Sequence, residues 1–166
     1  METAGSLFLE CSSRRLRELT GRIETCVTAL TTEQVWSRGG ENENAVGNLM
    51  LHLAGNVRQW IVSGVGGAPD VRQRDREFAS HGGVAVAELM ARLRTAVEEA
   101  DLVIASLPLE RLTERLTIQG YDVSVLEAVY HVVEHFSMHT GQIIFAAKMI
   151  TGADFGFYRH LNAKSV

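Results

Sequence analysis

The sequence predicts an all-α protein, a four-helix bundle with long connecting loops. Apolar residues recur every three to four positions in four segments, glycine clusters separate these segments, and the 166 residues include only two prolines. Helices of about 20 to 28 residues would be roughly 30 to 42 Å long, and such helices bury their apolar stripes best side by side. No repeat or linker interrupts the pattern, so we expect a single domain over residues 1–166.

The first two helices are expected over residues 6–30 and 44–63. The apolar stripe of the first helix consists of Leu9, Leu16, Leu19, Ile23, Val27 and Leu30. The second helix ends at a glycine cluster that starts at Gly64. The loops after both helices are long for an up-and-down bundle, and long connections often carry function. We therefore expect these loops to roof a site.

The third helix is expected over residues 84–107, and Pro108 ends it. Its apolar face consists of Val86, Met90, Leu93, Val97, Ala100, Ile104 and Leu107. The pattern then changes, because Leu116, Ile118 and Tyr121 surround Gly120. This change favours a small hairpin between the third and fourth helices.

Composition and charge exclude several classes of protein. The formal net charge is -4, and basic residues alternate with acids in the run from Arg72 to Glu77. We interpret that run as a solvated loop or helix end. Phosphate backbones need clustered lysine and arginine, so no nucleic-acid partner is expected. The N-terminus lacks the basic start of a secretory signal, and no apolar stretch approaches about 18 residues, so we expect a cytoplasmic protein without a membrane partner.

The two cysteines, Cys11 and Cys26, are too few for a disulfide framework. Both fall in the first expected helix, roughly 22 Å apart at a rise of about 1.5 Å per residue. They therefore cannot bridge each other. We interpret both as small apolar core residues in a reducing cytoplasm.

The fourth helix, expected over residues 124–151, carries a pair of histidines four residues apart. Ser124 and Glu127 form a capping box at its start, and a glycine follows its last turn. His135 and His139 lie on one face of this helix, so both imidazoles can reach a common point.

The second helix carries a matching polar stripe in an otherwise apolar segment. Its members are spaced by four: Asn44, Asn48, His52, Asn56 and Trp60. Buried imidazoles need partners, and one metal ion satisfies several of them in their neutral form. We therefore predict that His52, His135 and His139 hold one divalent metal ion. Three protein ligands leave a coordination position open, as in catalytic sites.

Other interpretations of these histidines remain open. Each could be a core or surface residue satisfied by hydrogen bonds alone. His131 is about 12 Å along the helix axis from His139 and is therefore expected to handle protons or hydrogen bonds instead of binding the ion. The paired Glu-x-x-His motifs of di-iron proteins and the His-Glu-x-x-His motif of zinc proteases are both missing.

At these residues the sequence resembles the DinB/YfiT-like family of metal-dependent enzymes. The resemblance rests on the segment from Asn48 to Asn56 with Trp60 downstream, and on His135-Phe-Ser-Met-His139-Thr-Gly-Gln142-Ile. It covers most of the chain. An uncharacterised branch of that family is the most similar, through Arg74-Asp75-Arg76-Glu77-Phe78 and Phe157-Tyr158.

The resemblance implies a four-helix bundle, a homodimer and a three-histidine site for nickel or zinc. It also implies an enzyme that activates a low-molecular-weight thiol, of the thiol S-transferase or isomerase type, acting on a small-molecule substrate. The alternatives are a metal-dependent hydrolase that uses hydroxide, or a metal-binding stress-response scaffold without catalysis. No catalytic acid or base is singled out. The candidates for holding the ligands or lining a substrate pocket are Asn48, Asn56, Trp60, His131, Glu134 and Gln142.

Overall fold

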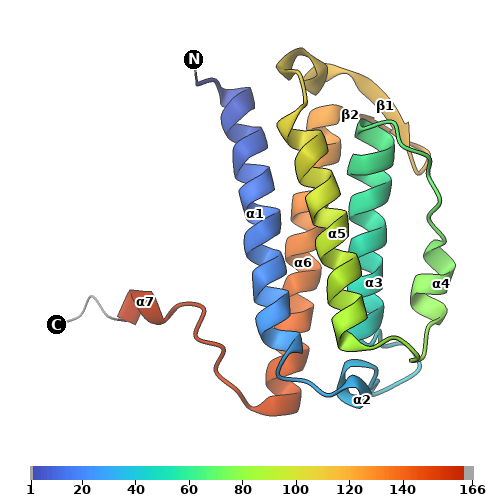
Figure 1. The fold of residues 1–166 in the computed structure, drawn as a ribbon, viewed down its shortest axis with the longest axis vertical. Helices are drawn as coiled ribbons and strands as arrows, with labels where there is room; N and C mark the ends of the chain where they lie inside the picture. The colour runs from blue at the N-terminus through green and yellow to red at the C-terminus, as the bar shows by residue number, and fades with distance from the viewer. Residues whose placement is uncertain (1, 163–166) are drawn as a thin grey trace.

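Four long helices make up most of the computed structural model, which describes residues 2–162. They are α1 (Ala4–Val27), α3 (Val46–Val57), α5 (Val86–Ala105) and α6 (Val125–Thr151). The four helices lie side by side (Figure 1), and α1 and α3 each contact both α5 and α6. The prediction of a mainly helical protein is confirmed.

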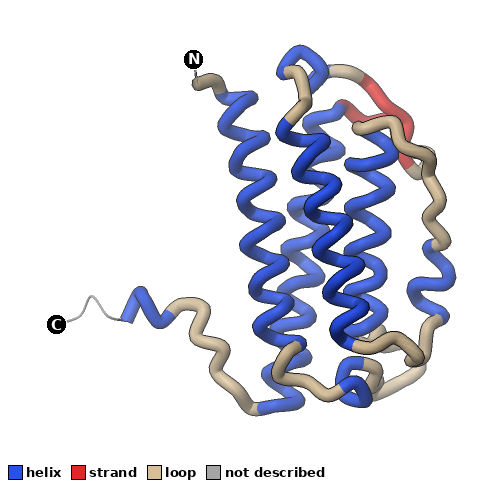
Figure 2. Tube along the Cα trace, in the orientation of Figure 1, coloured by secondary structure: helices blue, strands red, loops and turns tan. Residues whose placement is uncertain are grey.

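Short elements connect the long helices (Figure 2). They are α2 (Thr32–Val35), α4 (Arg74–Ala79), a 3₁₀ turn (Leu109–Thr113), the strands β1 (Arg115–Ile118) and β2 (Tyr121–Ser124), and α7 (Arg159–Asn162). The two strands pair antiparallel, so the expected hairpin between the third and fourth long helices is confirmed. The three short helices were not predicted, because a helix of four to six residues is too short to show a periodic apolar stripe.

The start and end of α6 are those that the sequence predicts. Ser124 Oγ accepts a hydrogen bond from the backbone N–H of Glu127 at 3.2 Å, and Glu127 Oε2 accepts one from the backbone N–H of Ser124 at 2.6 Å. Gly152 ends the helix with φ +67°, a left-handed conformation that glycine adopts without strain. These caps fix the register of the helix that carries two of the three histidines.

The core fills the space between the four long helices. Its largest fully buried side chains include Phe136, Leu16, Ile23, Met50, Leu53, Leu93 and Ile143, which come from all four helices. Burying one such side chain stabilises the fold by about 1.5–3 kcal/mol. The apolar stripes predicted for α1, α5 and α6 therefore face one common core, which holds α3 and α6 at a fixed separation.

The second long helix changes its hydrogen-bond pattern halfway along. After Val57 the chain continues as a π-helix, Arg58–Val65. A Cβ atom at Gly64 would overlap with the side chain of Ile118, so the hairpin packs closely on this segment. The expected α-helix over residues 44–63 is therefore wrong in its last turns, and Trp60 lies on the π-helical part.

A long segment between α3 and α5, here called the strap (residues 66–85), runs alongside α3 and contains α4 (Figure 1). The buried Asn48 anchors it, because its Nδ2 donates to the backbone oxygens of Glu77 and Ser80, each at 2.8 Å. Arg38 Nη2 donates to the same oxygen of Ser80 at 2.7 Å. The strap thus runs over α3, as expected of a loop that roofs a site.

After α6 the chain leaves the end of that helix and continues to α7 (Figure 1). On the way, Arg22 of α1 donates a hydrogen bond to the Tyr158 hydroxyl at 3.1 Å, and its guanidinium lies over the rings of Phe157 and Tyr158. Within residues 2–162, no helix combines the length and apolar character that crossing a membrane requires.

Candidate metal centre

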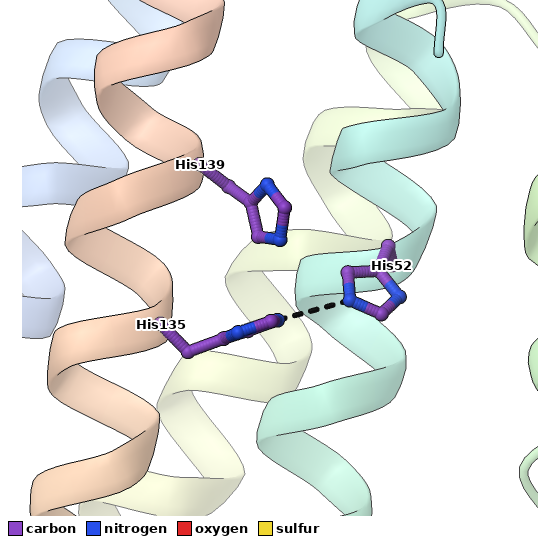
Figure 3. A group of neighbouring side chains, drawn as sticks. All are labelled: His52, His135 and His139. Atoms are coloured by element: carbon purple, nitrogen blue, oxygen red, sulfur yellow. Dashed lines mark hydrogen bonds between the residues drawn. The ribbon is translucent and has the colours of Figure 1, made fainter. Parts of the chain in front are cut away.

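Three histidines from two helices point toward one another in the space between the helices (Figure 3). His52 comes from α3, while His135 and His139 come from successive turns of α6. One nitrogen of each ring lies within 4.8 Å of the others. Nε2 of His52 and Nε2 of His135 are 2.9 Å apart, which makes the group compact. The predicted triad is therefore brought together.

Helical spacing explains this convergence. His135 and His139 are one turn apart and project from the same face of α6, with ring centres 4.5 Å apart. Between them in the sequence, Phe136 is fully buried in the core. The His52 ring lies edge-on to both, at 5.0 Å from the His135 ring and 5.2 Å from the His139 ring.

An ion pair from the strap contacts the His52 ring through its other nitrogen, Nδ1. His52 Nδ1 lies 3.0 Å from Glu77 Oε2. Nη2 of Arg72 lies at the same distance of 3.0 Å from this nitrogen. In the tautomer with its proton on Nδ1, the ring donates to the carboxylate and Nε2 is free to bind a metal. Arg72 donates to both oxygens of Glu77, from Nε at 2.7 Å and from Nη2 at 2.8 Å. The side chains of Arg72 and Glu77 are only 4% and 11% exposed, so this pair is rigidly enclosed.

Gly55 makes the close approach of this ion pair possible. A Cβ atom at this position of α3 would overlap with Oε1 of Glu77 and lie 2.9 Å from Nε of Arg72. With any larger residue here, the side chains of Glu77 and Arg72 would have to shift. The missing side chain at Gly55 thus leaves a notch in α3, and the Glu77 carboxylate fits into this notch beside His52.

His139 has its own partner on α6. Its Nδ1 lies 2.6 Å from Oε1 of Gln142, three residues on. The amide oxygen accepts the Nδ1 proton, so Nε2 of His139 also faces the cluster as an acceptor. Two of the three imidazoles are therefore oriented by side chains outside the cluster, the arrangement that metal-binding histidines usually have.

The protonation states suit metal binding. Burial, together with the neighbouring imidazoles of His139 and His52, lowers the pKa of His135 to about 3. Burial likewise lowers the pKa of His139, against the opposing hydrogen bond to Gln142. Burial alone would raise the pKa of Glu77, but the hydrogen bonds from Arg72 and His52 lower it below its usual value. Near neutral pH His135 and His139 are therefore neutral, and the Glu77 carboxylate beside His52 is ionised.

The donor set fits a divalent transition metal ion. Three imidazole nitrogens suit zinc, nickel, copper or iron, and the neutral ring is the form that binds. In a tetrahedral zinc site with bonds of about 2.0–2.1 Å, two imidazole nitrogens lie about 3.3 Å apart. The 2.9 Å between the Nε2 atoms of His52 and His135 is close to that value. All three ligand nitrogens lie within 4.8 Å of one another, so the rings have to shift before they bind one ion at equal distances.

A pocket of about 500 Å³ opens beside the cluster. Its walls include His52 and His135 from the cluster, and Asn56, Trp60, Arg72, Arg74, Gln119, Tyr121, Val123, Glu127 and His131 around them. The pocket is large enough for a small molecule, and it reaches two of the three candidate ligands.

Four of the side chains expected near the site do line the pocket or contact a ligand. Asn56, Trp60 and His131 line the pocket, and the His131 ring packs on the Trp60 ring with centres 4.0 Å apart. Gln142 contacts His139 directly. The indole Nε1 of Trp60 is buried and has no acceptor in the described part of the chain.

The other candidates lie elsewhere. The amide of Asn48 is used to anchor the strap, so this residue is a structural clamp instead of a substrate contact. Glu134 is exposed on the outer side of α6, where it borders a surface hollow with Arg15 and Tyr130. It therefore cannot fix an imidazole of the cluster. Asn44 is exposed and precedes α3, so the polar stripe begins only at Asn48.

Arg72 and Glu77 were not predicted from the sequence as residues of the site. The charged run around them was interpreted as solvated, which holds for the exposed Asp75 and Arg76 but is wrong for Arg72 and Glu77. The spacing of five between the two was the only signal, and it does not match a turn of helix. Burial of the pair depends on the notch at Gly55, which the sequence alone does not reveal.

Comparisons with known proteins place the chain among uncharacterised relatives. A family model described as a protein of unknown function, DUF1572, matches residues 3–160. The fold is similar to that of a conserved protein from Enterococcus faecalis, whose crystal structure superposes with a TM-score of 0.74. That similarity covers 87% of this chain and 97% of the other at 16% sequence identity, and it therefore concerns the fold alone. No protein of curated function matches the sequence.

Proposed function

The chain belongs to the DUF1572 family of proteins of unknown function, and we propose that it binds one divalent metal ion and uses it to activate a low-molecular-weight thiol. The observation that carries the proposal is the convergence of three imidazoles within 4.8 Å, beside a pocket for a small molecule. The resemblance to DinB/YfiT-like enzymes supports the thiol, as well as a four-helix bundle of that type and a single domain.

The residues that would hold the ion are His52, His135 and His139. When bound, a divalent ion with three neutral protein ligands supplies an undiminished positive charge that lowers the pKa of a thiol or water. Glu77 keeps the proton of His52 on Nδ1, and Gln142 does the same for His139. These contacts hold the rings in place before any substrate arrives, which lowers the reorganisation that binding requires.

The pocket would position the second reactant. Trp60 is only 3% exposed and, with His131, forms a wall that excludes water from the side of the histidines. In a transferase reaction the thiol sulfur forms a bond to an electrophilic carbon, the leaving group takes the bonding electrons, and the thiol proton is released. His131 lies in the pocket wall, at a ring distance of 5.3 Å from His135, where it could receive that proton.

The experiment that tests metal binding is elemental analysis of protein purified without a histidine tag. Wild-type protein is expected to hold about one zinc or nickel ion per chain, and His139→Ala is expected to lose it. Circular dichroism shows whether the variant keeps its helices. Absence of stoichiometric metal from wild-type protein, even after reconstitution, would contradict the proposal.

A thiol-dependent activity needs a separate screen. Bacillithiol, mycothiol and glutathione are each offered with a chromogenic electrophile such as chlorodinitrobenzene. Turnover is expected with at least one thiol in the metal-loaded protein and is expected to disappear in His52→Ala. Turnover of esters without any added thiol would instead favour a metal-dependent hydrolase, and tight metal binding with no turnover would favour a metal-binding scaffold.

We also propose that two copies associate through the outer face of α6, in the cytoplasm. Six large apolar side chains on this helix are more than a third exposed: Leu126, Tyr130, Met138, Phe145, Met149 and Ile150. Many exposed apolar side chains on one helix commonly mark a contact between proteins. Light scattering during gel filtration is expected to give twice the chain mass, and Phe145→Glu is expected to give the single mass.

A further inference from the structure

We propose that the pocket beside the three histidines binds a small molecule with a carboxylate group on a flat, unsaturated body, and that Arg74 holds this carboxylate. The proposal rests on the proposed function, because it names the class of substrate that the same site would take. Three features of the pocket carry it: an unpaired cation, the absence of a free negative charge, and aromatic walls.

The pocket wall contains two arginines, and only one of them is neutralised. Arg72 donates two hydrogen bonds to Glu77 and a third to Gln59 Oε1 at 2.9 Å, and its Nη2 also lies 3.0 Å from His52 Nδ1. Arg74 forms no ion pair within residues 2–162, although the strap around it is rich in acids. Its guanidinium lies over the ring of Phe78, 4.9 Å from the ring centre. It is therefore a cation held in place without a counter-ion.

The position of Arg74 ties it to the candidate metal centre. The Phe78 ring on which its guanidinium rests also packs on the ring of His52, with centres 4.7 Å apart. One aromatic ring thus separates the cation from a candidate ligand. A molecule bound by Arg74 would have its remaining atoms directed along the pocket toward His52 and His135.

No free carboxylate offsets this charge. Glu127 is the only acidic residue that lines the pocket in the described part of the chain. Its carboxylate accepts hydrogen bonds from Ser124 at the start of α6, and it pairs with Arg115 at 3.1 Å. The pocket therefore has an excess of positive charge, which attracts anions and rejects cations.

The aromatic side chains that line the pocket indicate the chemistry of the remaining part of the ligand. The Trp60 ring lies 4.0 Å from the ring of His131 and 6.4 Å from that of Tyr121, measured between centres. Tyr121 is 63% exposed at the pocket mouth, so its ring is available to a ligand. Flat π surfaces favour flat unsaturated groups, since these can stack in offset or edge-to-face arrangements. A volume of about 500 Å³ suits a molecule of that size.

The test uses benzoate as the probe and benzamide, an uncharged molecule of similar shape, as the control. Both are titrated into the metal-free and the zinc-loaded protein, and the indole N–H resonance of Trp60 is followed by NMR. The two indole resonances are assigned with Trp36→Phe. Benzoate is expected to shift the Trp60 resonance saturably in both forms, and benzamide is expected to bind at least about tenfold more weakly, since a charged hydrogen bond is lost.

Arg74→Gln and Arg76→Gln form a matched pair of variants. Both residues lie on α4 and are exposed, but only Arg74 lines the pocket of the histidines. Arg74→Gln is expected to weaken benzoate binding at least about tenfold, while Arg76→Gln keeps the wild-type affinity. Equal affinity for benzoate and benzamide, an unchanged affinity in Arg74→Gln, or equal losses in both variants would overturn the proposal.

The metal-free arm separates this proposal from metal binding. Benzoate binding that depends on Arg74 in the metal-free protein supports the proposal even where elemental analysis finds no metal. Conversely, a stoichiometric metal ion with no response to benzoate in either form overturns the substrate class and leaves the metal centre intact.

Discussion

The contact between His52 Nδ1 and Glu77 orients one ring of the candidate metal centre. Glu77 is held in turn by two hydrogen bonds from Arg72. All three side chains are nearly inaccessible to water, so each depends on the others for partners. Removing one leaves a buried charge or a buried donor without a partner, which is far more destabilising than losing an exposed contact.

Glu77→Gln is expected to weaken zinc binding about 10–100-fold while the helices persist. The amide is nearly the same size, but it carries no charge to stabilise the Nδ1–H tautomer and leaves Arg72 without a counter-ion. Competition between the protein and a chromogenic zinc chelator measures the effect. Asp75→Asn on the same helix is the control, since Asp75 is exposed and should leave the affinity unchanged. Equal zinc affinity in Glu77→Gln and wild type would show that the carboxylate does not orient His52.

The two cysteines are expected to react at very different rates. Cys11 is exposed on α1, so the prediction that both thiols lie in the core is wrong for it, whereas Cys26 is fully buried. Burial raises the pKa of Cys26 to about 11, so its thiol stays protonated in the native protein. A chromogenic disulfide reagent near pH 8 should therefore label Cys11 alone until denaturant is added. Rapid labelling of Cys26 in the native protein, whether in wild type or in Cys11→Ser, would contradict this.

The same pKa predicts a loss of stability at high pH. The folded state keeps the Cys26 proton up to about pH 11, whereas an unfolded thiol releases it near its ordinary value of about 8.5. Between these values the unfolded state binds fewer protons, so the free energy of unfolding falls as pH rises. Urea titrations of wild type and Cys26→Ala between these pH values should show a smaller decline in the variant.

Single residues differ in how well the sequence predicts their roles. His135 and His139 were predictable because a spacing of four places them on one helical face whatever lies around them. Glu77 was not, because its role depends on a contact between the strap and α3 across more than twenty residues of chain. Its distance to His52 comes from tertiary packing, on which helical periodicity carries no information.

At the scale of elements, the strap and α3 fit each other at one position. Gly55 lies in the interior of α3, where alanine would ordinarily stabilise a helix by about 1 kcal/mol. Here the added methyl group would overlap with Glu77, so the side chains of Glu77 and Arg72 would have to shift. Glycine at position 55 therefore lowers the stability of the helix but leaves space for the Glu77 carboxylate.

Gly55→Ala is expected to weaken zinc binding and to speed proteolytic cleavage within residues 66–85. The added methyl group would occupy the space that Glu77 of the strap fills. Limited proteolysis with mass spectrometry locates the cuts. The matched control is Gly21→Ala on α1, where a Cβ atom would meet nothing within 4 Å. That variant should gain about 1 kcal/mol of stability and keep its zinc affinity. Protection of the strap in Gly55→Ala equal to that in wild type would mean that the notch is not required.

Helices could be predicted from the sequence where their apolar residues recur with a regular period. The long helices were found within about two or three residues at most ends, and α6 was found with its caps, since capping boxes and terminal glycines are local signals. The π-helical turns after Val57 carry no such signal. They depend on the hairpin that packs over Gly64, and so on the tertiary structure.

At the scale of the whole molecule, the three histidines join two helices that are far apart in the chain. α3 and α6 are separated by the strap, α5 and the hairpin, and their mutual packing is already supported by the core. An ion bound by His52 on one side and by His135 and His139 on the other would add a second connection between them. Binding to the folded state alone stabilises it by mass action.

Zinc is therefore expected to raise the melting temperature, and a chelator to lower it again. At a free zinc concentration about 100 times the dissociation constant the gain is about 2.7 kcal/mol, which corresponds to roughly 5 to 10 °C for a domain of this size. His139→Ala should melt at the same temperature with and without zinc, because two histidines remain and the third contact is lost. Calorimetry of both proteins with zinc and then with chelator measures this. An equal rise in the variant would place the ion elsewhere, and no rise in wild-type protein would mean that the histidines hold the two helices together by hydrogen bonds alone.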